Sequence, residues 1–563
     1  MANIFEPRFL PASLHIEAIL RSTTLAGRRE TLKLIKDGLE FGDAYDATLE
    51  RIKGQDEKKA TLAMAALTWI CHSERPLQVD ELCHALAVEI GATDFDPENI
   101  PSIGTVLECC QGLIVIDSEA STVRLIHYTV QEYLCSHPDL FSKPQSTLAE
   151  TCLTYLNSRQ VKSLTPQSLP DYGSMPFLKY SARYWGTHTK NDLSDNARTL
   201  AQELLNQYES HISALSLLEQ AVSPNYSPLI TPPPLFSGLH CASFFGIVEL
   251  VTVFINADAY EADQQDCTGR TSLAWAARNG HEGVVKILLE RGDVDPNRLD
   301  KYSQTPLVSA AIMGHEGVVK LLLERENVDP NLREKGGNGP LGCAACYGHE
   351  GAVKLLLERE NVDPNLPNMY GDGPLGWAAI KGHEGVVQLL LERENVDPNR
   401  RNKNGRTPLV CAAIEGHEGV VEILLEWKNV DPNLPDENGY GPLACAAIKG
   451  HEGVVKLLLE RENVDPNRRD KNGRTPLVCA TINGHEGVVR LLLEREDVDP
   501  NRRDKHGGTP LSYASMKGHE RIVQLLQARK SFETPGVETP GASSRRERRR
   551  DVWRRRLLFD REK

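Results

Sequence analysis

The strongest constraint on this chain is a short phrase, Gly-His-Glu, that returns every 34 residues. It occurs eight times in the 563 residues and is followed by Gly-Val-Val in six of the eight copies. The glycines that open it are Gly280, Gly314, Gly348, Gly382, Gly416, Gly450, Gly484 and Gly518. A fixed period in this range indicates a stacked array of similar supersecondary units. We therefore expect a helical solenoid, in which each unit buries its apolar faces against its neighbours.

Each copy contains the signals for a turn followed by two short helices, as residues 403–436 illustrate. Gly405 allows a turn with positive φ, while Thr407 and the proline after it suit the start of a helix. Gly416 ends this helix, and a second helix is expected to begin at His417. The sequence Val-Asp-Pro-Asn then returns the chain to the next turn.

The order of these residues resembles the ankyrin repeat. Thr-Pro-Leu, Ala-Ala, Gly-His, Val-Val and Leu-Leu stand at that family's offsets over half of the chain. The resemblance implies a solenoid that binds proteins with its fingers and concave face. All eight copies depart from the family by lacking the histidine that usually follows Thr-Pro-Leu, and the loop at the base of each finger is one residue longer. A degenerate ninth copy, which precedes the other eight, retains this histidine as His240.

The N-terminal third has a different pattern. Helical periodicity is expected near residues 58–71, 76–86 and 101–110, followed by two β-like runs at 113–116 and 123–126. Three helices followed by a hairpin are typical of a winged-helix domain.

This part of the chain resembles the winged-helix and helical region that follows the nucleotide-binding module of fungal NACHT-type (STAND/NLR-like) proteins. The residues that carry the resemblance are His127 to Leu134 and Pro176 to Gly186. It implies the sensor side of a signal-transducing ATPase. A phosphate-binding loop, however, requires Gly-x-x-x-x-Gly-Lys-Ser/Thr, and Gly-Lys does not occur in the sequence. We expect no nucleotide hydrolysis, because that module is either lost or encoded upstream.

The fold class expected is therefore mostly α, with an ankyrin-repeat solenoid of about nine 34-residue repeats after a winged-helix domain and a helical region. The predicted domains are a helical linker segment (1–55), the winged-helix domain (56–145), the helical region (146–222), a proline-rich linker (223–236), the repeats (237–530) and a disordered arginine-rich tail (531–563).

Charge and composition limit the location and the partners. The chain carries a net charge of −14, yet residues 545–563 hold ten basic and four acidic side chains. Thirteen cysteines without disulfide-framework spacing favour a reducing compartment. No apolar run is long enough to span a membrane, and Glu6 to Arg8 do not suit a signal peptide. We expect an intracellular, cytoplasmic protein, with nuclear import through the tail as the alternative.

Chemical sites are not favoured by the motifs. The repeated histidines lack the His-Glu-x-x-His spacing of a zinc site, and side chains of adjacent repeats are ~10 Å apart, too far to share one ion. The same spacing prevents disulfides among Cys343, Cys411, Cys445 and Cys479, which we expect to be small buried hydrophobes. Residues 76–135 contain ten acidic side chains and one basic one, which disfavours DNA binding by the winged helix. We expect no catalytic residue, no metal, no cofactor and no small-molecule substrate.

Comparison of the copies with one another locates candidate protein-binding residues. Positions that are constant serve stacking, whereas positions that vary are available for recognition. Two positions vary most. The residue before Thr/Gly-Pro-Leu is Arg270, Gln304, Asn338, Asp372, Arg406, Tyr440 or Arg474, and the residue before Gly-His is Asn279, Met313, Tyr347, Lys381, Glu415, Lys449 or Asn483.

An apolar position two residues before Gly-His accompanies them. It holds Ile312, Ile380, Ile414, Ile448, Ile482 and Met516. Such a stripe is consistent with a protein-binding groove and equally with packing between neighbouring helices.

The function expected is that of a non-enzymatic scaffold or sensor that binds a protein partner on the concave and finger face. One alternative is the sensor half of a NACHT-type ATPase whose nucleotide-binding module is missing or upstream. The other is a nuclear or nucleic-acid-associated protein that acts through its arginine-rich tail.

Overall fold

The computed structural model describes residues 41–164, 174–190, 193–221, 235–257 and 260–533, which are mostly helical. They divide into two compact units, with the division between Ser272 and Leu273. This confirms the predicted fold class, although the finer domain boundaries remain predictions. Most of the predicted proline-rich linker, and the arginine-rich tail, lie outside the described residues. No described helix is both long and apolar enough to cross a membrane.

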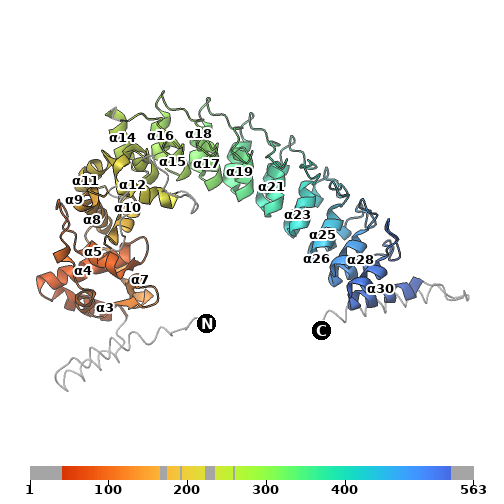
Figure 1. The fold of residues 1–563 in the computed structure, drawn as a ribbon, viewed down its shortest axis with the longest axis horizontal. Helices are drawn as coiled ribbons and strands as arrows, with labels where there is room; N and C mark the ends of the chain where they lie inside the picture. The colour runs from red at the N-terminus through yellow and green to blue at the C-terminus, as the bar shows by residue number, and fades with distance from the viewer. Residues whose placement is uncertain (1–40, 165–173, 191–192, 222–234, 258–259, 534–563) are drawn as a thin grey trace, which may run out of the picture. The chain divides into compact units, whose positions relative to one another are not determined.

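The first unit begins with helices around a small sheet (Figure 1). Its elements are α3 (Phe41–Lys53), α4 (Glu57–His72), β1 (Leu77–Gln78), α5 (Val79–Leu86), α6 (Ile103–Cys109), β2 (Ile114–Asp117), β3 (Thr122–Leu125) and α7 (Tyr128–Ser136). The strand order is β1-β3-β2, and both pairings are antiparallel. The predicted hairpin is present as β2 and β3. The helix predicted near 76–86 begins only at Val79, because residues 77–78 form β1, which was not predicted. Two residues cannot show a periodicity, and Leu77 is placed by its pairing with Val123.

A helical region continues the first unit. Its helices are α8 (Pro144–Asn157), α9 (Arg159–Lys162), α10 (Phe177–His188), α11 (Asp195–Leu205), α12 (Ile212–Ala221), α13 (Gly238–Phe245) and α14 (Val248–Asn256). The core is aromatic: Phe177 of α10 lies 5.4 Å from Trp69 of α4 and 5.2 Å from Tyr155 of α8, centroid to centroid. At the other end of α10, Trp185 lies 5.1 Å from Phe245 of α13. Helix α10 therefore joins the winged-helix elements to the degenerate repeat.

Two histidines are buried in this region in their neutral form. Burial lowers the pKa of His188 to about 4, with His72 adding to the effect, and burial lowers that of His211 to about 4. The neutral rings suit their partners. Nδ1 of His188 lies 2.6 Å from Oε1 of Gln145, and Nε2 of His211 lies 3.1 Å from the Leu156 carbonyl.

These pKa values predict acid sensitivity of the first unit. An unfolded histidine titrates near pH 6.5, so between pH 6.5 and 4 the unfolded chain binds more protons than the folded one, and stability falls as the pH falls. Each histidine is expected to remove up to about 3 kcal/mol over this window. Thermal unfolding at a series of pH values should show a smaller decline in His188→Gln than in the wild type. An equal decline in both would contradict this origin.

The second unit is a succession of helix pairs, one pair for each 34-residue copy. The first helices of the pairs are α15 (Ser272–Arg278), α17 (Pro306–Met313), α19 (Pro340–Tyr347), α21 (Pro374–Lys381), α23 (Pro408–Glu415), α25 (Pro442–Lys449), α27 (Pro476–Asn483) and α29 (Pro510–Lys517). The second helices are α16 (Glu282–Leu289), α18 (Glu316–Leu323), α20 (Glu350–Leu357), α22 (Glu384–Leu391), α24 (Glu418–Glu426), α26 (Glu452–Leu459), α28 (Glu486–Glu494) and α30 (Glu520–Glu533). In Figure 1 the pairs stand side by side in sequence order, as the period predicts.

The local signals in each copy act as the sequence predicts, with one correction. Thr407 caps α23 by accepting a hydrogen bond from the Val410 amide, and Gly416 ends the helix with φ +83°. The predicted start of the second helix at His417 is wrong by one residue, because α24 begins at Glu418 and His417 precedes it in a non-helical conformation. This conformation directs the histidine out of its own copy.

Candidate functional site

The repeated histidine ties each copy to the one before it. Nε2 of His451 donates a hydrogen bond to the carbonyl of Ile414, 2.9 Å away in the last turn of α23. Carbonyls in the last turn of a helix have no partner within that helix, so the imidazole of the next copy supplies one. The same bond, of 2.9 to 3.4 Å, is made by His315, His349, His383, His417, His485 and His519.

The glycine that opens the phrase and the glycine that follows it both lie close to a neighbouring copy, although the last copy has Arg521 at the second position, 3.6 Å from Glu486. A Cβ on Gly416 would lie 2.7 Å from Nδ1 of His451 in the next copy. A Cβ on Gly453 would lie 1.9 Å from the carboxylate of Glu418 in the preceding copy. That carboxylate therefore lies against the first turn of α26, where the helix dipole favours a negative charge.

A row of asparagines forms a second tie at the base of the fingers. Nδ2 of Asn433 donates to the carbonyl of Asn463 at 2.7 Å, and its Oδ1 accepts from the amide of Asp465 at 2.9 Å. One side chain thus satisfies two backbone groups of the next copy. The same pair of bonds is made by Asn297, Asn331, Asn365, Asn399 and Asn467. The sequence analysis treated Val-Asp-Pro-Asn only as a loop, although its constancy was a sign of this role.

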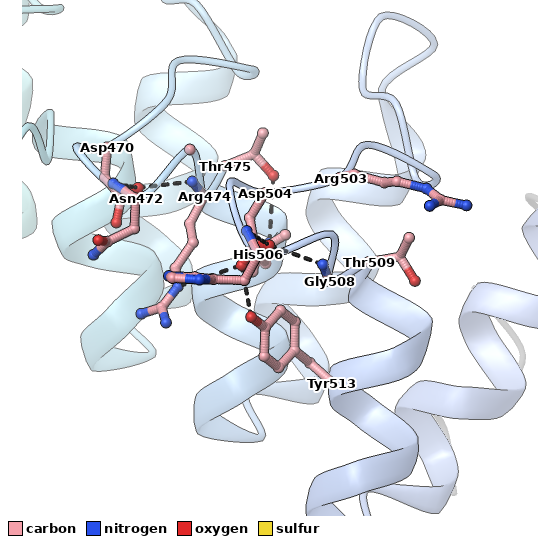
Figure 2. A network of polar contacts seen from close by, with 12 residues as sticks. Asp470, Asn472, Arg474, Thr475, Arg503, Asp504, His506, Gly508, Thr509 and Tyr513 are labelled. Carbon is pink, nitrogen blue, oxygen red and sulfur yellow. Dashed lines mark hydrogen bonds and ion pairs between the residues drawn. The ribbon is translucent and has the colours of Figure 1, made fainter.

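The fingers are tight turns closed by their first side chain (Figure 2). Oδ1 of Asp470 accepts from the amides of Asn472 and Arg474, at 2.8 and 2.7 Å. Asp504 closes the next finger in the same way with the amides of His506 and Gly508. The fingers are also joined to one another, since the amide of Lys505 donates to the carbonyl of Asn472 at 2.9 Å. Constant polar residues of the repeat are therefore occupied by backbone groups.

The four cysteines at one repeat position are buried, as predicted. Burial raises the pKa of Cys411, Cys445 and Cys479 to about 12, and raises that of Cys343 further. Thiols in this state are poor nucleophiles and poor metal ligands. Within the described parts of the chain, no three His, Cys, Asp or Glu side chains gather as metal ligands.

The family model for ankyrin repeats matches four overlapping segments, residues 239–334, 326–402, 394–470 and 461–534. Together they span more than half of the chain. The protein belongs to the ankyrin-repeat family. The match includes the degenerate copy with His240, whose ring nitrogens lie 2.8 Å from Oγ of Ser237 and 3.0 Å from the carbonyl of Gln264.

Two further similarities concern the rest of the chain. Residues 45–143 match the model of the winged helix domain of GPI inositol-deacylase, which agrees with the predicted winged helix. A curated relative, azaphilone pigments biosynthesis cluster protein L of Monascus ruber, is 27% identical over 324 residues. The alignment covers 49% of this chain and 68% of that protein.

The predicted binding residues before Thr/Gly-Pro-Leu are largely covered. Arg270 and Asp372 are buried, at 4% and 8% exposure, so the assumption that a variable position is a free position fails for them. Gln304, Asn338, Arg406, Tyr440 and Arg474 are half-buried.

Several of these residues vary because they match a neighbouring copy. Oδ1 of Asn338 accepts from the indole of Trp377 at 2.8 Å, and Oδ1 of Asp372 accepts from Asn402 at 2.7 Å. The burial that accompanies this contact raises the pKa of Asp372. Residues at this position therefore vary partly because they pair with a neighbouring residue and partly because they are exposed to solvent.

The residues before Gly-His lie on the surface instead. Met313 and Tyr347 are 44% and 58% exposed, and Lys381, Glu415, Lys449 and Asn483 are also exposed, whereas Asn279 is half-buried. The accompanying isoleucines at 312, 380, 414, 448 and 482 are half-buried, and Met516 is exposed. The ends of the first helices thus form a continuous row, here called the helix-end row, with an apolar flank.

Exposed apolar side chains gather in copies 2 to 4, counted from Gly280. Of the eight large apolar residues exposed in the described second unit, five belong there, and Leu299 directly precedes them. The five are Tyr302, Met313, Tyr347, Met369 and Tyr370. The fingertip residues Tyr302 and Tyr370 were not predicted as binding residues. They occupy a position that holds Gly336 in the finger between them. The amide of Met369 donates to the carbonyl of Gly336 at 2.9 Å, so the tyrosines flank a finger without a side chain at its tip.

Proposed function

We propose that this chain is a non-enzymatic interaction protein whose ankyrin array binds a protein partner along copies 2 to 4. The observation that carries the proposal is the exposed cluster of Tyr and Met on the helix-end row and fingertips there. Tyrosine and methionine are enriched at protein interfaces, where they fill apolar pockets of the partner. Ankyrin repeats are a protein-binding architecture, which supports the same conclusion.

The absence of catalysis is part of the proposal and is supported by how the reactive side chains are used. His451 and its equivalents donate to backbone carbonyls, the finger aspartates accept from backbone amides, and the buried cysteines have raised pKa values. Each of these repeated groups is therefore occupied by a backbone partner or buried.

The test is the loss of partner binding when the apolar anchors become charged. The partner is first identified by crosslinking to the full chain. Met313→Glu with Tyr347→Glu is then expected to lower the affinity for this partner about 30-fold, as loss of interface anchors does. Because both side chains are exposed, the fold should be unaffected. Met516→Glu with Lys517→Glu also replaces an exposed methionine and adds two glutamates, but in the last copy, away from copies 2 to 4, and serves as the control. Equal affinity of both variants would refute the location.

A second function is favoured by the winged-helix similarity. The array would then be the sensor half of a switch ATPase, and residues 45–143 would couple it to the nucleotide-binding module. A transcript with an in-frame Gly-x-x-x-x-Gly-Lys-Ser/Thr sequence upstream would favour this function.

A further inference from the structure

Two fingers of the array are strongly basic although the chain as a whole is acidic. Residues 399–406 read Asn-Arg-Arg-Asn-Lys-Asn-Gly-Arg, and residues 467–474 differ from them at one position. Each finger carries four basic side chains. The finger between them, 433–440, has none, and it contains Asp436 and Glu437. The two sets of four basic residues are therefore placed two copies apart, and the last finger, 501–508, adds Arg502, Arg503 and Lys505.

Each basic finger borders a hollow at an equivalent place. The first hollow is a small open depression lined by Gly373, Gly376, Arg400 and Arg406 among others. The second is lined by Gly441, Ala444 and Arg468, which lie 68 residues further along. Glycine replaces the usual threonine at 373 and 441, and the arginine stem of the next copy lies over each of them. The distance from Cδ to the position of an added Cβ is 3.6 Å for Arg400 and 3.5 Å for Arg468.

The arginines of the two basic fingers have unused hydrogen-bonding capacity. Arg400, Arg406 and Arg468 line the hollows, whereas Arg474 belongs to the same finger as Arg468 but does not line the second hollow. Nε of Arg400, Arg406, Arg468 and Arg474 is buried and makes no hydrogen bond within the described residues. A buried donor without an acceptor is costly. Arg474 is nevertheless held in place, with Nε 3.8 Å from Oδ2 of Asp504 and its guanidinium 6.0 Å from the ring centroid of Tyr513 (Figure 2).

We propose that the two arginine pairs, Arg400 with Arg406 and Arg468 with Arg474, bind carboxylate side chains of one extended acidic segment of a protein partner. The inference rests on the proposed function and specifies the chemistry of the partner. A carboxylate offers the arginine fork two acceptors. Repeats ~10 Å apart place the pairs ~20 Å apart, and an extended chain advances ~3.3 Å per residue. The acidic residues of the segment should therefore be about six positions apart.

The finger between the two pairs favours a peptide over a nucleic acid. Glu437 is exposed at its tip. A phosphate backbone would bring a negative charge past this glutamate at each nucleotide. A peptide places neutral residues there and acidic residues only at the arginines.

The experiment uses the full chain and a fluorescein-labelled 14-residue peptide of Ser, Gly and Ala with two Glu-Glu pairs six residues apart. Fluorescence anisotropy should show binding about tenfold tighter than to a peptide of the same composition whose glutamates are adjacent. Arg400→Ala with Arg468→Ala should weaken binding about tenfold. Lys403→Ala with Lys471→Ala removes the same charge from the same fingers, but outside the hollows, and should change binding less than about twofold.

Arg400→Lys with Arg468→Lys retains the positive charge and the aliphatic stem, so it tests the inference even if the alanine variant misfolds. It should also lower the affinity for the peptide, because lysine lacks the fork of the guanidinium. Three outcomes would each overturn the inference. They are equal losses of affinity in the arginine-to-alanine and lysine-to-alanine variants, equal affinity for the spaced and the adjacent peptide, and tighter binding of oligothymidylate than of the peptide. Capture of the partner that depends on Met313 and Tyr347 would persist in those cases, which distinguishes failure of this inference from failure of the proposed function.

Discussion

Gly416→Ala is expected to lower the stability of the array by about 3 kcal/mol, a large effect for one methyl group. Two costs add. Gly416 has φ +83°, a conformation that costs other residues ~1–2 kcal/mol. The new Cβ would also lie 2.7 Å from the ring of His451, which is fixed by its hydrogen bond to Ile414. A rigid ring that cannot move away adds an overpacking cost of ~1–3 kcal/mol.

The chain provides a control that separates these two costs. Gly518 occupies the same position in the last copy with φ +74°, but no described atom lies within 4 Å of the Cβ that alanine would add there. Gly518→Ala should therefore cost only the conformational part, about 1 kcal/mol. Urea unfolding measures the loss of stability in both variants, and hydrogen exchange of the amides in α23 and α26 locates the loss caused by Gly416→Ala. If the two variants lose the same stability, the histidine contact is not a rigid constraint.

Gly186→Ala is expected to destabilise the first unit by about 3 kcal/mol. Gly186 lies inside α10, where alanine ordinarily stabilises a helix by up to ~1 kcal/mol. Here its Cβ would lie 2.1 Å from the ring of Phe245, which is buried against Trp185. The steric conflict therefore exceeds the gain in helix propensity. Scanning calorimetry should show the loss in the transition of the first unit.

A double-mutant cycle identifies the contact responsible. Phe245→Ala alone should cost ~3–5 kcal/mol, and combined with Gly186→Ala it should cost less than the sum, because the small side chain leaves room for the methyl group. Gly104→Ala in α6 is the helical control, since the nearest atom to its added Cβ is Oγ of Ser102 at 3.8 Å. Additive losses in the cycle would exclude Phe245 as the cause.

The elements of this protein could be predicted from its sequence because their signals are local. Thr407, Gly405 and Gly416 act within one copy. Their positions hold threonine in five copies, the turn glycine in seven and the helix-ending glycine in all eight, so repetition made the signals visible. The direction of His451 could not be predicted, because its acceptor lies 37 residues earlier in another copy. The strand β1 was missed for the same reason, since Leu77 is extended only through its pairing with Val123.

The candidate site was predictable in part. Met313 and Tyr347 are exposed, as expected of variable positions. Asp372 is buried and pairs with Asn402. In a single sequence, a residue that varies to match its neighbour cannot be distinguished from a residue that varies because it is exposed to solvent. Only coordinates separate the two cases. Tyr370 was missed because fingertip residues were read as turn formers.

The hydrogen bonds between copies leave the number of copies in the array unspecified. Asn433, His451 and the finger amides each reach only the adjacent copy, 30 to 37 residues away. Excision of 68 residues from the middle would therefore join surfaces of the same chemistry and leave each of these ties a partner, although copy-specific contacts such as that of Asn338 with Trp377 could be lost. None of these described ties depends on the number of copies. Unequal recombination within the gene would therefore lengthen or shorten the surface available to the ligand without changing the fold of each copy.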